Sequence, residues 1–175
     1  PVAMQISGTG GVGKSTLANY YARQQFRGKK YDWVIWLAGG LDEKTAEHNL
    51  QSQLAVLGTE LGFDPKQTKE RMLYRLIYKE LAAKGKGLIV FDDMPSYRLM
   101  ATYLPESFDQ PKMDVLVTTR NGRYFGTELN KITLDVFTLE DAKLYIHRML
   151  KNGATDEEAV LLATTLGRYP LALTQ

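Results

Sequence analysis

A glycine-rich octapeptide near the start of the chain constrains the fold more than any other segment. Residues 8–15 read Gly-Thr-Gly-Gly-Val-Gly-Lys-Ser and match the pattern G-x-x-x-x-G-K-S/T at every fixed position. A short apolar run at residues 2–6 precedes the pattern, and residues 15–25 that follow are rich in helix-tolerant types. A strand, a glycine-rich turn and a helix in this order are typical of a phosphate-binding loop. The sequence therefore predicts that this chain binds a nucleoside triphosphate.

Each residue type in this loop has a chemical role. The glycines let the backbone curl so that successive amides point at phosphate oxygens, and the next helix adds its positive N-terminal end. Lys14 supplies a point charge for the outer phosphates and is also a candidate catalytic residue. Ser15 is placed to bind Mg²⁺ through its hydroxyl. The residues expected to hold the nucleotide here are Gly10, Gly11, Val12, Gly13, Lys14, Ser15 and Thr16.

Composition excludes several classes of protein. The chain has 175 residues, with 22 Lys and Arg against 20 Asp and Glu, and no dense basic run, so we expect no nucleic-acid partner. It has no cysteine, which excludes disulfides and cysteine metal sites and fits a reducing compartment. The longest apolar runs are far too short to span a bilayer. We therefore expect a cytoplasmic protein with no membrane partner, and we interpret the chain as a piece of a longer one.

Short apolar strands alternate with helical segments over most of the chain, which is typical of an α/β fold with a parallel sheet covered on both faces. A helix is expected at residues 41–57, and another begins near Asp64-Pro65 and carries apolar residues at positions 73, 76, 77 and 81. Beyond the strand before the loop, we expect strands at residues 33–38, 88–91, 115–117 and 132–134.

From residue 138 onward the pattern indicates helices only. Residues 138–141 and 155–158 both fit a capping box, in which a hydroxyl accepts from the amide three residues on while the acid reaches back. The residues expected on the buried faces are Leu139, Ala142, Ile146, Met149 and Leu150 in the first helix, and Ala159, Leu162, Ala163 and Leu166 in the second. We expect a P-loop nucleotide-binding domain at residues 1–135 and the start of a helical subdomain at residues 136–175.

Polar residues follow two of the apolar strands. Mg²⁺ bound through phosphates needs one carboxylate, and Asp92 directly after residues 88–91 is predicted to share the metal with Ser15. Asp93 would orient or deprotonate an attacking water, unless it only ends the strand in a turn. Arg120 would reach the terminal phosphate and distinguish a triphosphate from a diphosphate. Lys14, Asp93 and Arg120 are therefore the candidate catalytic residues.

Three other classes of phosphate-loop protein fit less well. A GTPase carries an Asn-Lys-x-Asp base reader, and residues 130–133 end in threonine instead of the carboxylate. Partitioning-type ATPases place a lysine where this chain has Thr9. A small-molecule kinase remains an alternative, because its loop can be matched onto residues 8–14, although the doubled acid and the trailing helices are less expected there.

The motifs together resemble the NB-ARC nucleotide-binding module of the signal-transduction ATPases with numerous domains (STAND). The phosphate loop is followed by an aromatic second strand at residues 31–37, an acid strand at 88–93 and a sensor strand at 115–120. The glycine-x-x-proline-leucine motif of the family then matches Gly167, Pro170 and Leu171, with Arg168-Tyr169 in place of the usual small or apolar pair. This last match discriminates best, because kinases and GTPases have no reason to place it after two helices.

The resemblance implies a five-stranded parallel P-loop NTPase sheet with helices on both faces, followed by a partial helical subdomain. The sensor strand is expected between the strand before the loop and the acid strand. The implied ligands are ATP or ADP with Mg²⁺, and Pro170 closes over the nucleotide. The implied partners are other domains of the same longer chain, with nucleotide-dependent self-assembly.

Three functional hypotheses follow from these motifs. The first is an ATP/ADP-binding molecular switch module of a larger signalling or regulatory protein, which is at most a slow ATPase. The second is a small-molecule kinase in which Asp93 serves the acceptor. The third is an interaction scaffold that a bound nucleotide merely stabilises.

Overall fold

The computed structural model describes residues 3–105, 112–122, 130–151 and 153–174, and the strands in these ranges form one parallel sheet. The strand order is β2-β3-β4-β1-β5, and each neighbouring pair is parallel. This confirms the predicted fold class and the position of the sensor strand β4 between β1 and β3. Val2, which the expected first strand included, lies outside the described residues. The strands are β1 Ala3–Ser7, β2 Trp33–Ala38, β3 Gly87–Asp92, β4 Met113–Thr119 and β5 Asn130–Thr133.

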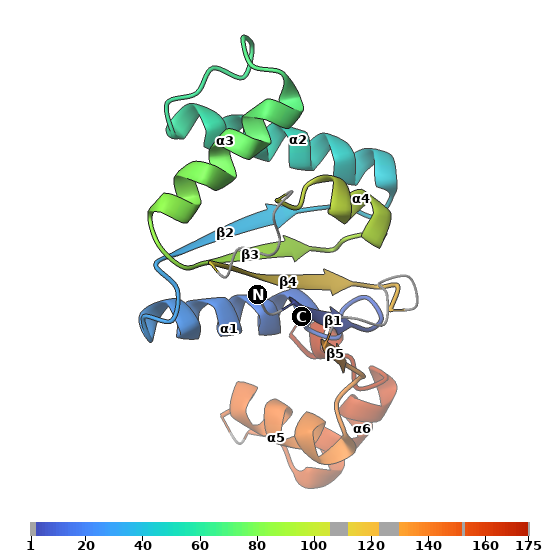
Figure 1. Cartoon of the computed structure of the whole chain (residues 1–175). Helices are drawn as coiled ribbons and strands as arrows, with labels where there is room; N and C mark the ends of the chain where they lie inside the picture. The colour runs from blue at the N-terminus through green and yellow to red at the C-terminus, as the bar shows by residue number, and fades with distance from the viewer. Residues whose placement is uncertain (1–2, 106–111, 123–129, 152, 175) are drawn as a thin grey trace.

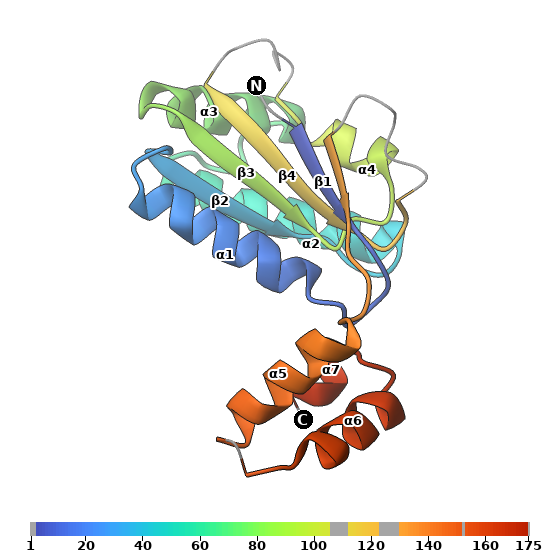
Figure 2. The same ribbon diagram turned by 90° about the horizontal axis from the view of Figure 1, so that it is seen from below.

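Helices cover both faces of the sheet, so the fold has three layers (Figure 1). One face is covered by α1, and the other by α2, α3 and the short α4, as the view from below also shows (Figure 2). The remaining helices, α5 to α7, lie together beyond the sheet at the end where β1 leads into α1 (Figure 2). The helices are α1 Lys14–Arg27, α2 Glu43–Glu60, α3 Glu70–Ala83, α4 Tyr97–Thr102, α5 Leu139–Met149, α6 Asp156–Thr165 and α7 Pro170–Leu173.

Strand β3, which lies between β2 and β4, shows how the core is divided between the two faces. Leu88 and Val90 belong to the cluster packed against α1, whereas Ile89 and Phe91 belong to the cluster packed against α2, α3 and α4. All four side chains are fully buried. A strand that is buried on both faces has no polar side to show, which is why this segment reads as a continuous apolar run.

The structure places the start of α3 later than the sequence suggested. Residues 64–67 form a turn, in which the Asp64 carboxylate accepts from the Lys66 amide at 2.9 Å and the Asp64 carbonyl accepts from the Gln67 amide at 3.2 Å. An aspartate that bonds its own downstream backbone favours a turn over a helix start. The helix therefore begins at Glu70, and the prediction of a start at Asp64-Pro65 was wrong.

One of the two expected capping boxes forms in full. At α6 the Thr155 hydroxyl accepts from the Glu158 amide at 3.2 Å, and the Glu158 carboxylate accepts from the Thr155 amide at 2.8 Å. At α5 the Thr138 hydroxyl accepts from the Asp141 amide at 3.1 Å, but the Asp141 carboxylate takes the Thr138 hydroxyl proton instead of the amide. Aspartate is one methylene shorter than glutamate and does not reach back to the cap backbone.

The expected core of the helical segment was only partly right. Ala142, Ile146, Ala159 and Ala163 are buried against one another. The larger side chains on the expected faces are exposed, to 37% for Leu139, 54% for Met149, 51% for Leu150 and 40% for Leu162. Three of the four buried residues are alanines, which let α5 and α6 approach closely, so the large residues on either side stay outside the contact. Within the described ranges, no helix combines the length and apolarity needed to cross a bilayer.

Charged side chains join α5 to the first turn of α6. The Asp156 carboxylate accepts from Lys143 Nζ at 2.8 Å and lies 3.0 Å from His147 Nε2. The Lys143 ammonium, and after it His147, holds the pKa of Asp156 below its ordinary value of 3.8. A carboxylate with a depressed pKa stabilises the folded state above its unfolded pKa, and this contribution is lost as the pH falls through the folded value.

Replacing Asp156 with asparagine should therefore lower the melting temperature at neutral pH and have little effect in acid. The two proteins are expected to differ near pH 7 and to converge only as the pH falls below 3.8, through the lowered pKa at which the wild-type carboxylate takes up its proton. Glu157→Gln, at the neighbouring exposed position, is the matched control and should show no such dependence. Melting curves across this range test the prediction, and a difference that does not change with pH would contradict it.

Candidate functional site

The loop between β1 and α1 depends on two glycines in left-handed conformations. Gly11 has φ 81° and Gly13 has φ 96°, a region that residues with a Cβ rarely occupy. Gly13 is also the N-cap residue of α1 and provides no side-chain cap. A Cβ added at Gly13 would meet nothing within 4 Å, so the backbone conformation, and not lack of space, requires glycine there. The loop thus leaves open space in front of the helix N-terminus.

The first turn of α1 presents backbone donors to this space. The amides of Lys14, Ser15 and Thr16 donate to no protein acceptor among the residues that the structure describes. Unpaired amides at a helix N-terminus, together with the helix dipole, form a binding site for an anion such as phosphate. Thr16 itself is exposed in this turn.

Lys14 is the cation of the loop. Its side chain is largely buried, and Nζ donates to the Thr9 carbonyl at 2.8 Å. Burial lowers the pKa of the Lys14 ammonium from its ordinary 10.5; the carboxylate of Asp93 opposes this shift, the nearby Arg120 adds to it, and Asp92 again opposes it. Four of the predicted site residues are therefore close enough to interact electrostatically, two of each charge.

Ser15 and Asp92, the two predicted metal ligands, lie in direct contact. Ser15 Oγ donates to Asp92 Oδ1 at 2.7 Å, across the space between the start of α1 and the end of β3. No group of three or more His, Cys, Asp or Glu side chains gathers within the described ranges. A cation here would rely on one carboxylate, one hydroxyl, phosphate oxygens and water, and that donor set fits Mg²⁺.

Asp93 occupies a strained turn immediately after β3. Its φ of 53° is left-handed, which costs a residue with a side chain about 1 kcal/mol. Hydrogen bonds on both sides hold this conformation: the Asp93 amide donates to Thr118 Oγ1 at 2.8 Å, and the Asp93 carbonyl accepts from the Gly40 amide at 3.1 Å. Strain held in this way at a strand end is common at functional sites.

Arg120 and Asp93 form a two-pronged ion pair. Arg120 Nε donates to Asp93 Oδ1 at 3.1 Å, and the second prong reaches Oδ2 at 3.3 Å. The guanidinium also lies against the loop, because a Cβ added at Gly10 would be 3.6 Å from one of its terminal nitrogens. Asp93 therefore holds Arg120 beside the phosphate loop, where a terminal phosphate would compete for the same donors.

Thr118 and Thr119, the two residues before Arg120, make hydrogen bonds that the sequence did not predict. The Thr119 hydroxyl donates to the Met94 carbonyl at 2.7 Å and accepts from the Asn121 amide at 3.0 Å. Thr118 was not predicted as a site residue, although it bonds the backbone of Asp93. The available signal was two hydroxyls at the carboxyl end of a strand with the apolar run 115–117.

The start of α7 rests on the phosphate loop. The Leu171 amide donates to the Gly11 carbonyl at 3.1 Å, and a Cβ added at Gly11 would be 3.2 Å from the Leu171 Cβ. Pro170 is the first residue of α7, where its fixed φ and missing amide hydrogen suit a helix start. Arg168, which departs from the family pattern, adopts φ 60° in the turn before it. The contact with the loop thus comes from Leu171, which the sequence did not single out as a binding residue.

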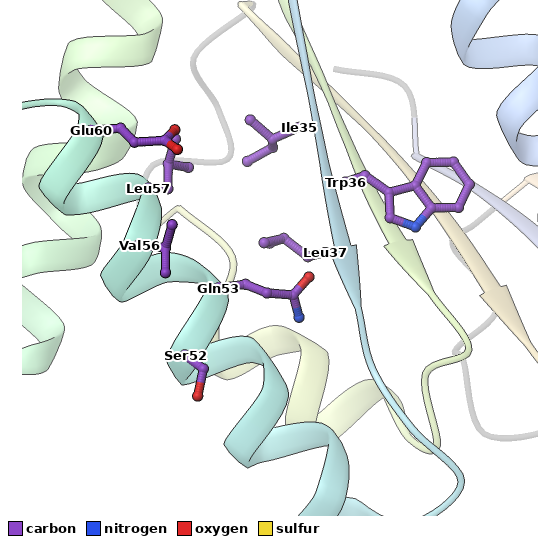
Figure 3. Close-up of a pocket in the computed structure, with 8 residues that line it drawn as sticks. All are labelled: Ile35, Trp36, Leu37, Ser52, Gln53, Val56, Leu57 and Glu60. Atoms are coloured by element: carbon purple, nitrogen blue, oxygen red, sulfur yellow. The ribbon is translucent and has the colours of Figure 1, made fainter.

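A separate groove runs along the outer edge of the sheet, between β2 and α2 (Figure 3). Its volume is about 380 Å³, and Ile35 and Leu37 point toward α2 while Trp36 points to the other side of the strand. None of the predicted site residues lines it. Its lining consists of Ile35, Trp36, Leu37, Ser52, Gln53, Val56, Leu57 and Glu60.

Comparison with protein families gives one match over most of the chain. The profile of the NB-ARC domain family matches residues 1–153. No curated protein matches the sequence.

Solved structures with the same fold include a STAND protein and two ORC proteins. One is a STAND protein with a tetratricopeptide repeat sensor from Pyrococcus horikoshii, which is 23% identical with a TM-score of 0.59 and is matched over 98% of this chain but 26% of its own length. The Aeropyrum pernix ORC1 protein, solved in complex with DNA, is 16% identical with a TM-score of 0.63, over 99% of this chain and 52% of that one. The ORC2 protein of the same organism, solved as ADPNP-ADP complexes, is 13% identical with a TM-score of 0.57, over 99% and 62%. This chain therefore spans about a quarter of the STAND protein that it resembles.

Proposed function

The chain belongs to the NB-ARC domain family, and on this basis we propose that it is an ATP/ADP-binding molecular switch module of a larger signalling or regulatory protein. In this proposal residues 1–135 are the nucleotide-binding domain and residues 136–175 begin a helical subdomain. An intracellular location, where ATP and Mg²⁺ are supplied, and contacts with further domains of the same chain are part of the proposal. So is self-assembly that depends on the bound nucleotide.

One observation carries this proposal: a complete phosphate loop in direct contact with the helical segment. The Leu171 amide at the start of α7 donates to the carbonyl of Gly11, inside the loop. A ligand that rearranges this loop therefore acts on α7 directly. An isolated phosphate site with no such contact would suit an enzyme equally well.

The roles of the individual residues follow from their contacts. The amides of the first turn of α1 and the Lys14 ammonium would bind phosphate oxygens, and Ser15 with Asp92 would hold Mg²⁺, which supplies positive charge between the outer phosphates. Asp93 would orient water at the terminal phosphate. Because Asp93 is already paired with Arg120, we propose that any hydrolysis is slow and serves to reset the switch.

The switch requires that ATP and ADP favour different arrangements, because a ligand with equal affinity for both shifts no population. Arg120 is the proposed source of the difference. In this structure its guanidinium is bound by Asp93 beside the loop. A third phosphate would offer Arg120 a second partner of higher charge, whereas ADP would leave the Asp93 pair intact.

Calorimetry with ADP, ATP and GTP, each with Mg²⁺, tests the binding claim. We expect both adenine nucleotides to bind and GTP to bind more weakly, since residues 130–133 lack the carboxylate of a guanine reader. Mass spectrometry of the purified protein should also identify ADP or ATP as a copurified ligand. Phosphate transfer to a metabolite would favour a kinase, and absence of any nucleotide binding would contradict the proposal.

Substitution of Arg120 by alanine should change the preference between the two nucleotides. We expect ATP affinity to fall about tenfold, the value of one guanidinium–phosphate pair, while ADP affinity changes little. Arg98→Ala is a matched control, because Arg98 forms an exposed ion pair with Glu43 at 3.1 Å and was not predicted to contact nucleotide. Equal losses for ATP and ADP in the Arg120 variant would show that Arg120 does not read the third phosphate.

A further inference from the structure

One buried threonine joins the two acidic residues at the carboxyl end of β3, Asp92 and Asp93. Thr118 lies on β4 and is fully buried. Its hydroxyl donates to Asp92 Oδ1 at 2.5 Å and accepts from the Asp93 amide at 2.8 Å. The same hydroxyl thus donates to Asp92, the proposed metal ligand, and accepts from the backbone amide of Asp93. Loss of this hydroxyl would leave a main-chain donor without a partner.

The bond to Asp92 fixes the orientation of its carboxylate. Oδ1 accepts from two hydroxyls, Ser15 Oγ at 2.7 Å and Thr118 Oγ1 at 2.5 Å, which come from α1 and β4. Within the part of the chain that the structure describes, no hydrogen bond involves Oδ2. A carboxylate with one oxygen anchored and the other free is prepared to bind a cation or a water of its shell.

The bond to Asp93 supports the left-handed turn that directs its side chain. With φ 53° the Asp93 amide points toward β4, and the Thr118 hydroxyl is its acceptor. The next amide, on Met94, donates to the Thr118 carbonyl at 2.9 Å, so β4 holds the turn at two successive residues. Arg120, two residues beyond Thr118 on the same chain segment, is the partner that Asp93 reaches.

From this juxtaposition we propose that Thr118 is a positioning residue for the Mg²⁺-dependent part of nucleotide binding. It acts through Asp92 and Asp93 and does not itself contact nucleotide or metal. The inference rests on the proposed nucleotide-binding function. The inference divides the nucleotide affinity into two parts. The part supplied by the loop amides and Lys14 does not depend on Thr118. The part added by Mg²⁺ does depend on Thr118.

Thr118→Val keeps the shape of the side chain and removes the hydroxyl. Calorimetry should measure the affinity for ADP and for a non-hydrolysable ATP analogue, each with Mg²⁺ and with chelator. The ratio of the two affinities is the Mg²⁺ gain. In Thr118→Val this gain should fall by roughly tenfold or more, as expected when a partner of a metal ligand is lost. Affinity in chelator should stay within about a factor of two. Thr118→Ser keeps the hydroxyl and should restore the Mg²⁺ gain.

Thr119→Val is the matched control. Thr119 is equally buried and adjacent on the same strand, but its hydroxyl bonds the Met94 carbonyl and the Asn121 amide and neither carboxylate. It should keep the Mg²⁺ gain, even if it lowers stability. Thr118→Cys, whose thiol is a weak donor, replaces the valine variant if that protein does not fold, and should show the same loss.

A second measurement needs no nucleotide or metal. In the free protein, the amide of Asp93 should exchange with solvent faster in Thr118→Val than in wild type, and the serine variant should restore its protection. An unchanged Mg²⁺ gain or unchanged protection of Asp93 in Thr118→Val would overturn the inference while leaving the proposed function in place. Failure of the wild-type protein to bind any nucleotide would contradict both the proposed function and this inference.

Discussion

Substitution of Lys14 by alanine is expected to weaken ADP and ATP binding by about a hundredfold or more, the largest loss from any single change in the loop. The Lys14 side chain is largely buried and its ammonium donates to the Thr9 carbonyl, so part of its hydration is already lost before phosphate arrives. A contact between a partly desolvated cation and a phosphate oxygen is strong because solvent screens it little. Titration calorimetry measures the loss.

The control for Lys14 is Lys84→Ala, which removes an exposed lysine at the end of α3. Its nucleotide affinity should equal that of wild type. The Lys14 variant should melt close to wild type, because the substitution removes one hydrogen bond to a carbonyl but also removes the cost of burying a charge. Undiminished nucleotide binding in a folded Lys14 variant would contradict the assignment of the loop.

Phe91→Ala should cause the largest loss of stability, about 3–5 kcal/mol in the free energy of unfolding. Phe91 is fully buried on β3, in the cluster between the sheet and α2, α3 and α4, and its removal leaves a cavity in close-packed surroundings. The backbone of Phe91 pairs with Leu37 on one side and Val117 on the other, so neighbouring strands limit how far the site can collapse.

Urea unfolding of Phe91→Ala and of Leu41→Ala tests this. Leu41 is 72% exposed, so its variant should lose less than about 0.5 kcal/mol. Because Asp92 follows Phe91 directly, we also expect a lower Mg²⁺ gain in nucleotide affinity at temperatures where the Phe91 variant is still folded. A loss of stability in the Phe91 variant no larger than in the Leu41 variant would contradict the packing described for this face.

The sheet was predictable because local and global preferences agree. A strand such as β3, buried on both faces, requires an apolar run, and the polar residues after it must lie at the carboxyl edge of the sheet. Apolar runs alone do not determine the order in which the strands pair. The resemblance to a family supplied that order by placing β4 between β1 and β3, and the pairing confirms it.

The helical segment was less predictable, for physical reasons. A periodic pattern marks which residues face one way, but not how closely two helices approach. Here the alanines Ala142, Ala159 and Ala163 set the contact, and larger residues such as Met149 remain outside it. Similarly, the sequence placed Pro170 at the nucleotide, whereas the backbone contact with the loop is made one residue later, by Leu171.

Within the site, the sequence identified four polar side chains but not the hydrogen bonds that position them. Ser15, Asp92, Asp93 and Arg120 were expected, and they lie in contact as two pairs. The role of Thr118 depends on the register between β3 and β4 and on the left-handed turn at Asp93, neither of which a motif encodes.

A crystal structure of the protein with ADP and Mg²⁺ tests the central claim most directly. We predict that the β-phosphate lies against the amides of Lys14, Ser15 and Thr16 and that Lys14 Nζ has left the Thr9 carbonyl, 2.8 Å away in the present structure, to bind it. Nucleotide bound elsewhere on the protein, with Lys14 still donating to Thr9, would contradict the claim.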